Sequence, residues 1–394
     1  MTGDFQKKPF VKKLFLSIIE KKYARQRRDP PKPEKFLIPH PSREKEGSTV
    51  INVGVIGCGH WGPNHIRIFS QLPDSNTLMC ADLDQNRLTQ LSQQYVGLKT
   101  TTDYKDILSN PDIDAVCVSA PTNLHYELSK ESLEAGKHVL CEKPLALTAA
   151  ECEELQEVAT AHDKIMMVGH VFVFNAGIVW LKKLIESGDL GNIYYAYATR
   201  TNLGPFRYDV NALWDLAPHD ISIFNYLFDA PPLNVSARGQ TYLDHSLEDL
   251  AFATLEYPEK IIANIHVSWL DPKKVRQITI VGDKKMVVWD DLDNVGPIKL
   301  YDKHVEKTST YYATYGEFQM LSREGSITIP KIGFSEPLKE QGRYFIECIK
   351  ENRLPGKADA EKGRQVVATL HAIQKSMQLQ GSHVVLDETS EVTQ

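Results

Sequence analysis

Cysteine is scarce in this chain, and long apolar runs are missing. The six cysteines among 394 residues form no CxxC pair, and several fall in apolar, strand-like runs, so we expect reduced core residues and no metal site. No apolar run approaches the ~20 residues that cross a bilayer. The apolar stretch Phe10–Ile19 contains Lys12 and Lys13, which distinguishes it from a secretory signal peptide. These absences predict a cytoplasmic protein without a transmembrane segment.

Composition and charge are those of a folded protein with one unusual end. Hydrophobic residues make up 42% and charged residues 24%, which excludes wholly disordered, collagen-like and coiled-coil chains. The net charge is −6, but residues 1–48 carry +7, which leaves −13 for the rest. An acidic body argues against nucleic acid as a partner. The length is sufficient for two or three domains.

Residues 1–48 are expected to form a basic, proline-rich extension. Apolar residues between Val11 and Ile19 recur at the spacing of a short amphipathic helix, and five prolines lie between Pro30 and Pro41. The helix could dock on a neighbouring subunit, on another partner or on an anionic membrane surface. It could equally pack on its own subunit or remain disordered.

Residues 49–172 alternate strand and helix patterns. Apolar strands are expected at 50–56, 77–81, 115–120 and 138–141, with helices between them. Asn123 is expected to cap one of these helices and Gly136 to end it. This alternation predicts the doubly wound parallel sheet of a Rossmann domain, in an α/β chain.

Residues 173–394 predict a second, α+β domain with a large, open, mostly antiparallel sheet. Strand patterns recur at 193–201, 233–237, 251–256, 261–269, 276–281 and 286–289, with a short helix at 219–228. Helices near 340–350 and 361–379 close the chain and are expected to return towards the first domain. An open sheet has a broad apolar face, which suits a homodimer or a homotetramer.

The most informative motif is a glycine-rich turn between the first predicted strand and helix. It reads Gly57-Cys58-Gly59-His60-Trp61-Gly62. Gly57 allows the tight turn, Gly59 lets a pyrophosphate approach the backbone, and Gly62 lets the helix pack closely on the strand. Asp82 follows the second strand, where a carboxylate accepts hydrogen bonds from a ribose and repels a 2′-phosphate. We therefore expect NAD as the cofactor. NADP is the alternative, because the nearby Arg87 could bind its 2′-phosphate.

Two further clusters have the residue types for acid–base chemistry. Lys143 follows a strand, at the edge of the sheet where ligands bind in such folds, and Pro144 restricts its backbone. Asp215 and His219 are four residues apart and would share a face if this segment is helical. A histidine paired with a carboxylate suits general acid–base work. Metal ligation and a structural cap at the helix start are the alternatives for this pair.

The glycine turn, Glu142-Lys143-Pro144 and the Asp215/His219 pair together resemble the Gfo/Idh/MocA family of NAD(P)-dependent sugar and inositol dehydrogenases, over about residues 50–380. Three runs, at 170–175, 213–222 and 267–272, are similar to the branch that oxidises C3 of UDP-N-acetylglucosamine or its uronic acid. Those enzymes act before an aminotransferase in making 3-amino sugars for surface polysaccharides. The resemblance therefore implies a nucleotide-sugar substrate.

The resemblance also implies roles for individual residues. His219 would take the hydroxyl proton, Lys143 would stabilise the developing charge, and Asp215 would orient His219 or bind a neighbouring hydroxyl. Lys143 and His219 could exchange roles as a coupled pair. The implied cofactor-lining residues are His60, Trp61, Ala120, Pro121, Asn123, His125, Glu142 and Lys143, and the implied substrate residues are Asn175 and His219. We also expect Arg207, Tyr208 and Asn211, in the stretch before Trp214, to touch substrate, with ordinary loop residues as the alternative.

Several other functions stay open at this stage. An NADP-dependent reductase of a 3-keto nucleotide sugar would use the same residues in reverse. A free-sugar or inositol dehydrogenase would not need the nucleotide, and an NAD-dependent glycosidase would release sugar without net NADH. A non-catalytic NAD-binding regulator is the remaining alternative, and the presence of Lys143, Asp215 and His219 argues against it.

Overall fold

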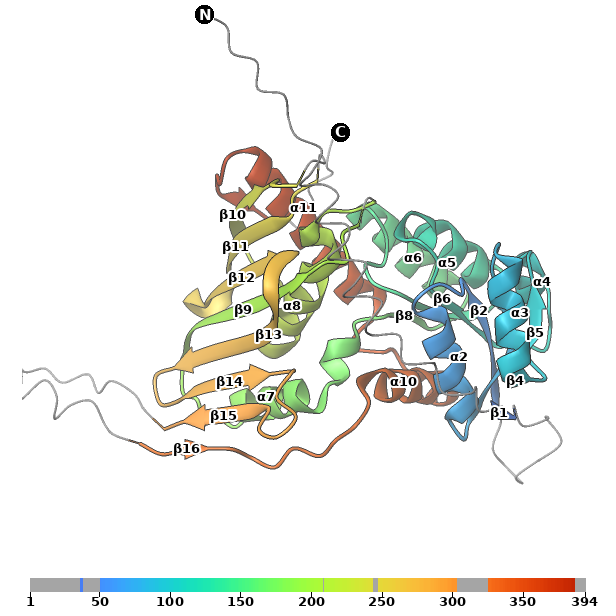
Figure 1. Ribbon diagram of the computed structural model, residues 1–394, viewed down its shortest axis with the longest axis horizontal. Helices are drawn as coiled ribbons and strands as arrows, with labels where there is room; N and C mark the ends of the chain where they lie inside the picture. Colours follow the sequence, from blue (N-terminus) through green and yellow to red (C-terminus); the bar gives the residue numbers. More distant parts are fainter. Residues whose placement is uncertain (1–35, 38–49, 208, 244–246, 303–324, 387–394) are drawn as a thin grey trace, which may run out of the picture.

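Two sheets lie side by side in the computed structural model, which describes residues 36–37, 50–207, 209–243, 247–302 and 325–386 (Figure 1). The first sheet is parallel and the second is mostly antiparallel, each with helices packed against it. The predicted α/β class, with a Rossmann domain followed by an open-sheet domain, is confirmed. The predicted helix near residues 11–19 lies outside the described residues.

The first sheet has six parallel strands in the described residues, in the order β5-β3-β2-β6-β7-β8. These strands are β2 (Ile51–Ile56), β3 (Ser75–Ala81), β5 (Lys99–Thr101), β6 (Ala115–Val118), β7 (His138–Cys141) and β8 (Met166–Val168). Both faces of the sheet are buried, which explains why strands such as β6 and β8 contain only apolar residues. A short strand β1 (Phe36–Leu37) pairs with β4 (Tyr95–Val96) beside this sheet.

Helices cover the two faces of the first sheet in two groups. On one face α2 (Gly62–Gln71) and α3 (Gln85–Gln94) share a core with α10 (Pro337–Glu351). On the other face lie α4 (Lys105–Leu108), α5 (His125–Glu134) and α6 (Ala149–Ala161). The chain thus returns from the second sheet to pack α10 beside α2, as Figure 1 shows.

The second sheet has nine strands in the described residues, in the order β16-β15-β14-β13-β9-β12-β11-β10-β17. Only β9 and β12 pair in parallel among these described strands. Their bounds are β9 (Ile193–Leu203), β10 (Asn234–Gln240), β11 (Leu250–Glu256), β12 (Ile262–Ser268), β13 (Leu270–Gly282), β14 (Met286–Asp290), β15 (Ile298–Tyr301), β16 (Ile327–Thr328) and β17 (Val384–Val385).

One face of the second sheet is covered and the other is open. Three helices share a core with it, namely α7 (Ala176–Glu186), α8 (Ala212–Phe228) and α11 (Ala360–Gln378). Along β9 the buried Ala196 alternates with the exposed Tyr195 and Tyr197, as a pleated strand requires. Helix α11 contacts α8 and β10 in the second sheet and α6 and β8 in the first, so it joins the two halves.

Two local expectations are corrected by the structure. Helix α8 begins at Ala212, seven residues before the predicted start, because the Asn211 side chain accepts a hydrogen bond from Trp214 N and caps it. Pro218 then lies inside the helix, where a proline is disfavoured. Asn123 lies in the short 3-10 turn Thr122–Leu124, and α5 begins after Leu124 with no side-chain cap.

All six cysteines lie in described residues, where they are free and buried. None of the helices in the described ranges is long and apolar enough to cross a membrane.

Candidate active site

The glycine turn joins the end of β2 to the start of α2, and its three glycines face different surroundings. Gly57 has φ +91°, and a Cβ there would lie 2.6 Å from Ala120 N. A Cβ on Gly62 would lie only 2.1 Å from the Gly57 carbonyl oxygen. A Cβ on Gly59 would meet nothing within 4 Å. Gly57 and Gly62 therefore allow the turn itself, while Gly59 leaves open space where a pyrophosphate could approach the backbone.

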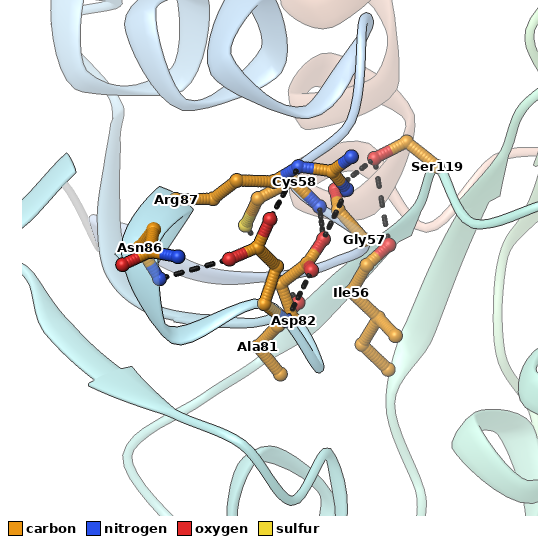
Figure 2. Close-up of polar contacts among 9 residues, drawn as sticks. Ile56, Gly57, Cys58, Ala81, Asp82, Asn86, Arg87 and Ser119 are labelled. Atoms are coloured by element: carbon orange, nitrogen blue, oxygen red, sulfur yellow. Dashed lines mark hydrogen bonds and ion pairs between the residues drawn. The ribbon is translucent and has the colours of Figure 1, made fainter. Parts of the chain in front are cut away.

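Asp82, at the end of β3, is held against this turn (Figure 2). Its Oδ2 accepts a hydrogen bond of 2.6 Å from Cys58 N, and its Oδ1 accepts one of 2.8 Å from Asp84 N. The Arg87 guanidinium lies 3.5 Å from Asp82 and 3.4 Å from Asp84. A fixed carboxylate beside the turn fits the ribose of NAD, because it would repel a 2′-phosphate. Arg87 is half exposed and partly offsets that charge.

The loop after β6 and the loop after β7 are tied together by a buried histidine. The two ring nitrogens of His125 lie 2.7 Å from the Pro144 carbonyl oxygen and 2.9 Å from the Ala120 carbonyl oxygen. Burial lowers the pKa of His125, but Cys141 and these two carbonyls outweigh burial and raise it to about 9. His125 thus holds the two loops that contain Ala120 and Lys143-Pro144 in place through their backbone carbonyls. Pro121 is exposed, and the exposed Asn123 borders a separate shallow hollow over α5.

Glu142 forms a buried pair with a residue that the sequence reasoning missed. His65, on α2, lies with its Nε2 2.8 Å from Glu142 Oε1, and the two side chains are 2% and 12% exposed. Burial raises the pKa of Glu142, but the His65 hydrogen bond and the Lys143 charge outweigh it and lower the pKa. The pair joins the glycine-turn helix to the Glu142-Lys143-Pro144 segment. In the sequence, this pair was indicated only by a histidine in the first turn of the predicted helix.

One large cleft brings the three expected catalytic residues together with part of the glycine turn. It has a volume of about 1780 Å³, and His60 and Trp61 of the glycine turn border it. Lys143, Asp215 and His219 border it as well. Lys143 Nζ donates a hydrogen bond of 2.8 Å to the backbone carbonyl of Asp215, one helical turn before His219. Asp215 and His219 both lie in α8, so they share a helix, as their spacing allowed if the segment was helical.

The carboxylate of Asp215 forms hydrogen bonds with residues other than His219. It accepts hydrogen bonds of 3.2 Å from Arg207 and 3.2 Å from the indole of Trp269. Arg207 also bonds Asp209 at 2.9 Å, so its charge is shared between two carboxylates. Of the two roles expected for Asp215, orientation of His219 is not seen in this geometry.

His219 lies in an unusually cationic environment. Burial lowers its pKa well below the ordinary value of 6.5, and the charges of Lys143, Arg200 and Arg276 lower it further. The Phe172 ring packs edge-on against it, with 5.0 Å between ring centroids. His219 is therefore neutral at pH 7, and a neutral imidazole can accept a proton.

Sequence reasoning also missed the wall beside His219. The guanidinium groups of Arg200 and Arg276 both lie over the Phe172 ring, at 4.6 and 5.1 Å from its centroid. Arg200 makes a buried two-pronged ion pair with Asp220, with distances of 2.9 and 2.7 Å, and Arg276 bonds Asp291 at 2.5 Å. Both arginines come from strands of the second sheet, where no local pattern distinguished them from other strand residues.

The expected substrate residues differ in whether they border the cleft. Asn175 borders the cleft, caps α7 by accepting from Gly177 N at 2.8 Å, and donates to Asp291 at 3.1 Å. Asn211 is 5% exposed and does not border the cleft, because its amide caps α8 and donates to Glu248 at 2.7 Å. Tyr208 lies outside the described residues. No cluster of three His, Cys, Asp or Glu residues that could hold a metal ion occurs in the described part of the chain.

A Rossmann domain with this turn, followed by an open-sheet domain that completes the cleft, defines an NAD-binding oxidoreductase. The model of the oxidoreductase family with an NAD-binding Rossmann fold matches residues 51–170, and the Gfo/Idh/MocA C-terminal domain matches residues 178–288. The two matches cover more than half of the chain, which belongs to the Gfo/Idh/MocA family. The resemblance and the NAD-binding domain expected from the sequence are confirmed.

Individual relatives are distant. An uncharacterized oxidoreductase, YrbE, of Bacillus subtilis is 27% identical over 51% of this chain and 60% of its own length. The myo-inositol 2-dehydrogenase of Thermotoga maritima is 24% identical over 83% of this chain and 96% of its own length. Among solved structures, the UDP-N-acetylglucosamine 3-dehydrogenase GnnA of Acidithiobacillus ferrooxidans has a TM-score of 0.71 at 22% identity, covering 84% of this chain and 98% of that one.

Proposed function

We propose that this protein is an NAD-dependent dehydrogenase that oxidises a secondary hydroxyl, at C3, of a nucleotide-linked sugar such as UDP-N-acetylglucosamine. The observation that carries the proposal is the cleft that Lys143 and His219 share with the glycine turn. A proton acceptor, a cationic donor and a nicotinamide site on one cleft are the parts that oxidation of an alcohol requires.

In this proposal His219 and Lys143 divide the proton chemistry. NAD, when bound, accepts the hydride that leaves the sugar carbon. His219, whose pKa is lowered by burial and by the surrounding cations, accepts the hydroxyl proton. Lys143, fixed by its bond to the Asp215 carbonyl, hydrogen-bonds the same oxygen and stabilises its developing negative charge. Burial also lowers the pKa of Lys143, although the charges of Asp215 and Glu142 act in the opposite direction.

The size and charge of the cleft support an extended, anionic substrate. About 1780 Å³ exceeds the roughly 300–1,000 Å³ of a site for one small molecule, so the cleft can hold a cofactor and a large second ligand. Lys274 and Lys331 border it and have no carboxylate partner in the described part of the chain. Unpaired ammonium groups suit the diphosphate of a nucleotide sugar. The reduced state of all six cysteines is consistent with a cytoplasmic enzyme.

A free cyclitol or sugar is the second candidate substrate, because the myo-inositol 2-dehydrogenase of Thermotoga maritima matches most of this chain. The nucleotide separates the two candidates. A free cyclitol would leave Lys274 and Lys331 without an anion, whereas a nucleotide sugar would engage them.

The test is the absorbance of reduced nicotinamide with NAD and each of four substrates: UDP-N-acetylglucosamine, its uronic acid, N-acetylglucosamine and myo-inositol. A carbonyl trap pulls an unfavourable equilibrium forward. We expect NADH only with the two nucleotide sugars, and no NADH with Lys143→Met at unchanged NAD affinity. NADH formed from myo-inositol but from neither nucleotide sugar would reject the proposed substrate class.

We also propose that the open face of the second sheet joins two copies of the chain. The exposed aromatic and aliphatic residues of β9, β11 and β12 form one apolar surface, made of Tyr195, Tyr197, Phe252 and Ile262. Sedimentation should give a dimer or tetramer, and Tyr195→Glu with Phe252→Glu should shift it to monomer. A wild-type monomer at micromolar concentration would contradict this arrangement.

A further inference from the structure

A second, smaller cavity lies between α8 and the loop before α11, and His170 lines it. Its volume is about 160 Å³, enough for several water molecules. Six of its lining residues are His170, Ser222, Asn225, Tyr226, Asp229 and Lys357. None of these six residues borders the large cleft.

Some buried polar atoms of the lining residues have no partner. Both ring nitrogens of His170 and the Nδ2 of Asn225 are buried without a hydrogen-bond partner in the described part of the chain, and the Nδ1 of His219, at the large cleft, is a further such atom. His170 is only 1% exposed. Leaving such a group unsatisfied costs about 1–3 kcal/mol, so buried groups of this kind bind water where a cavity gives it room. The cavity is polar and large enough to supply that water.

Helix α8 connects the two cavities with one polar face. His219, Ser222, Tyr226 and Asp229 are three, four and three residues apart, so they follow one another along the same side of the helix. Ser222 Oγ donates a hydrogen bond of 2.8 Å to the His219 carbonyl. At the far end the Asp229 side chain is 77% exposed and pairs with Lys182. The row therefore runs from the cleft to solvent.

His170 lines the same cavity as Ser222, Tyr226 and Asp229 of this row. The segment that follows it, Val171–Phe174, packs on α8, and the Phe172 ring contacts His219. Burial and the Lys143 charge lower the pKa of His170 to about 4, although Glu142 acts in the opposite direction. A neutral imidazole has one donor and one acceptor nitrogen, so it can receive a proton on one side and release one from the other.

We propose that His170 and the water of this cavity form a proton exit for the dehydrogenase reaction, which carries the proton taken by His219 along α8 to solvent at Asp229. The inference rests on the proposed function. Oxidation of one alcohol breaks an O–H and a C–H bond, sends the hydride with its electron pair to NAD and leaves one proton. His219 accepts that proton at the nitrogen facing the cleft and releases one from buried Nδ1. Since cofactor and sugar fill the cleft, the second cavity gives the proton another way out.

The test compares His170→Phe, which keeps a ring but removes both nitrogens, with His170→Gln, which keeps a donor and an acceptor. Single-turnover NADH formation is measured together with proton release to an indicator dye, in H₂O and in D₂O. We expect His170→Phe to slow both signals about tenfold or more near pH 7 and to increase the solvent isotope effect, with NAD and substrate affinities unchanged. His170→Gln should restore part of the rate.

The pH profile gives a readout that a packing defect would not change. The charged and titratable groups that face the two histidines are Lys143, Arg200, Arg276, Glu142, Tyr226, Asp229, Lys357 and Lys362. In His170→Phe the loss should shrink as pH rises, because hydroxide can then remove the proton without the relay. A loss that is equal at every pH would overturn the proposal.

Asp229→Asn provides a second variant that should fold. Asp229 ends α8 with φ +55°, a left-handed conformation that asparagine also adopts. We expect slower proton release and an unchanged affinity for NAD. Wild-type proton release and solvent isotope effects in both Asp229→Asn and His170→Phe would overturn the proton exit. A wild-type enzyme that oxidises no nucleotide sugar would instead reject the proposed function, and the exit can then be tested with the substrate that is oxidised.

Discussion

Two glycines of the same turn should respond in opposite ways to the same added methyl group. Gly59→Ala places a Cβ where nothing lies within 4 Å, and Gly59 has no left-handed φ, so the free protein should tolerate it. Replacing glycine by alanine at such a site commonly stabilises a protein by about 0.4–1 kcal/mol through the unfolded chain. The methyl group would, however, occupy the space that the pyrophosphate needs.

The expected loss of affinity follows from the contact that is removed. A backbone N–H bonded to a phosphate is worth about 1.5–3 kcal/mol. Losing one such bond weakens NAD binding about ten- to 150-fold. Gly62→Ala differs, because its Cβ would lie 2.1 Å from the Gly57 carbonyl oxygen and force the backbone apart. Such overpacking costs about 1–3 kcal/mol, which the better helix propensity of alanine offsets only in part.

Thermal unfolding without cofactor and fluorescence titration with NAD measure the two effects separately. Gly59→Ala should keep the melting temperature and lose NAD affinity, whereas Gly62→Ala should melt lower, by about 2–4 °C for each kcal/mol. NAD should then stabilise wild type against heat and barely stabilise Gly59→Ala. Wild-type NAD affinity in Gly59→Ala would refute the placement of the pyrophosphate at this turn.

Three further predictions concern charge and pH. Asp82→Asn should reduce the preference for NAD over NADP about tenfold, measured as the ratio of the two dissociation constants, because it removes the charge that repels a 2′-phosphate; an unchanged ratio would contradict the role of Asp82. Arg200→Met leaves Asp220 2% exposed and unpaired, so the free energy of unfolding in denaturant should fall by about 3–5 kcal/mol, and a loss under about 1 kcal/mol would contradict this. Burial and the neighbouring charge of a lysine lower the pKa of His138 to about 4, and its Nδ1 accepts a hydrogen bond of 3.0 Å from Ile165 N. As pH falls from 6.5 to 4, the unfolded chain therefore binds a proton at His138 before the folded chain does, and the free energy of unfolding decreases. His138→Gln should make the dependence of that free energy on pH shallower by up to about 1.4 kcal/mol per pH unit.

The sequence was most informative where chemistry depends on a local pattern. The strand before Gly57, the spacing of the three glycines and the carboxylate at Asp82 are all set within some thirty residues, so their arrangement followed from sequence alone. Lys143 and Asp215 are 72 residues apart, and only the shared family pattern linked them before the structure did.

The wall of the cleft could not be predicted because its members meet through tertiary packing. Arg200 on β9 and Arg276 on β13 face Phe172 only after two strands pair across a long stretch of chain. Helix α8 was mistaken at its start because Pro218 disfavours a helix interior, whereas the cap at Asn211 and the packing of the helix on the sheet outweigh that penalty. Asn211 was predicted to touch substrate because the helix start was placed too late. Before that start, the sequence cannot distinguish a residue that caps a helix from a loop residue that lines a pocket.

The most direct test of the central claim follows the hydrogen at C3 of the sugar. UDP-N-acetylglucosamine carrying deuterium at C3 is incubated with NAD and wild-type protein, and the recovered cofactor is weighed by mass spectrometry. We expect reduced cofactor that carries one deuterium, formed more slowly than with the unlabelled sugar, and none with Lys143→Met. Reduced cofactor without deuterium, or equal labelling with Lys143→Met, would contradict hydride transfer from C3 in this cleft.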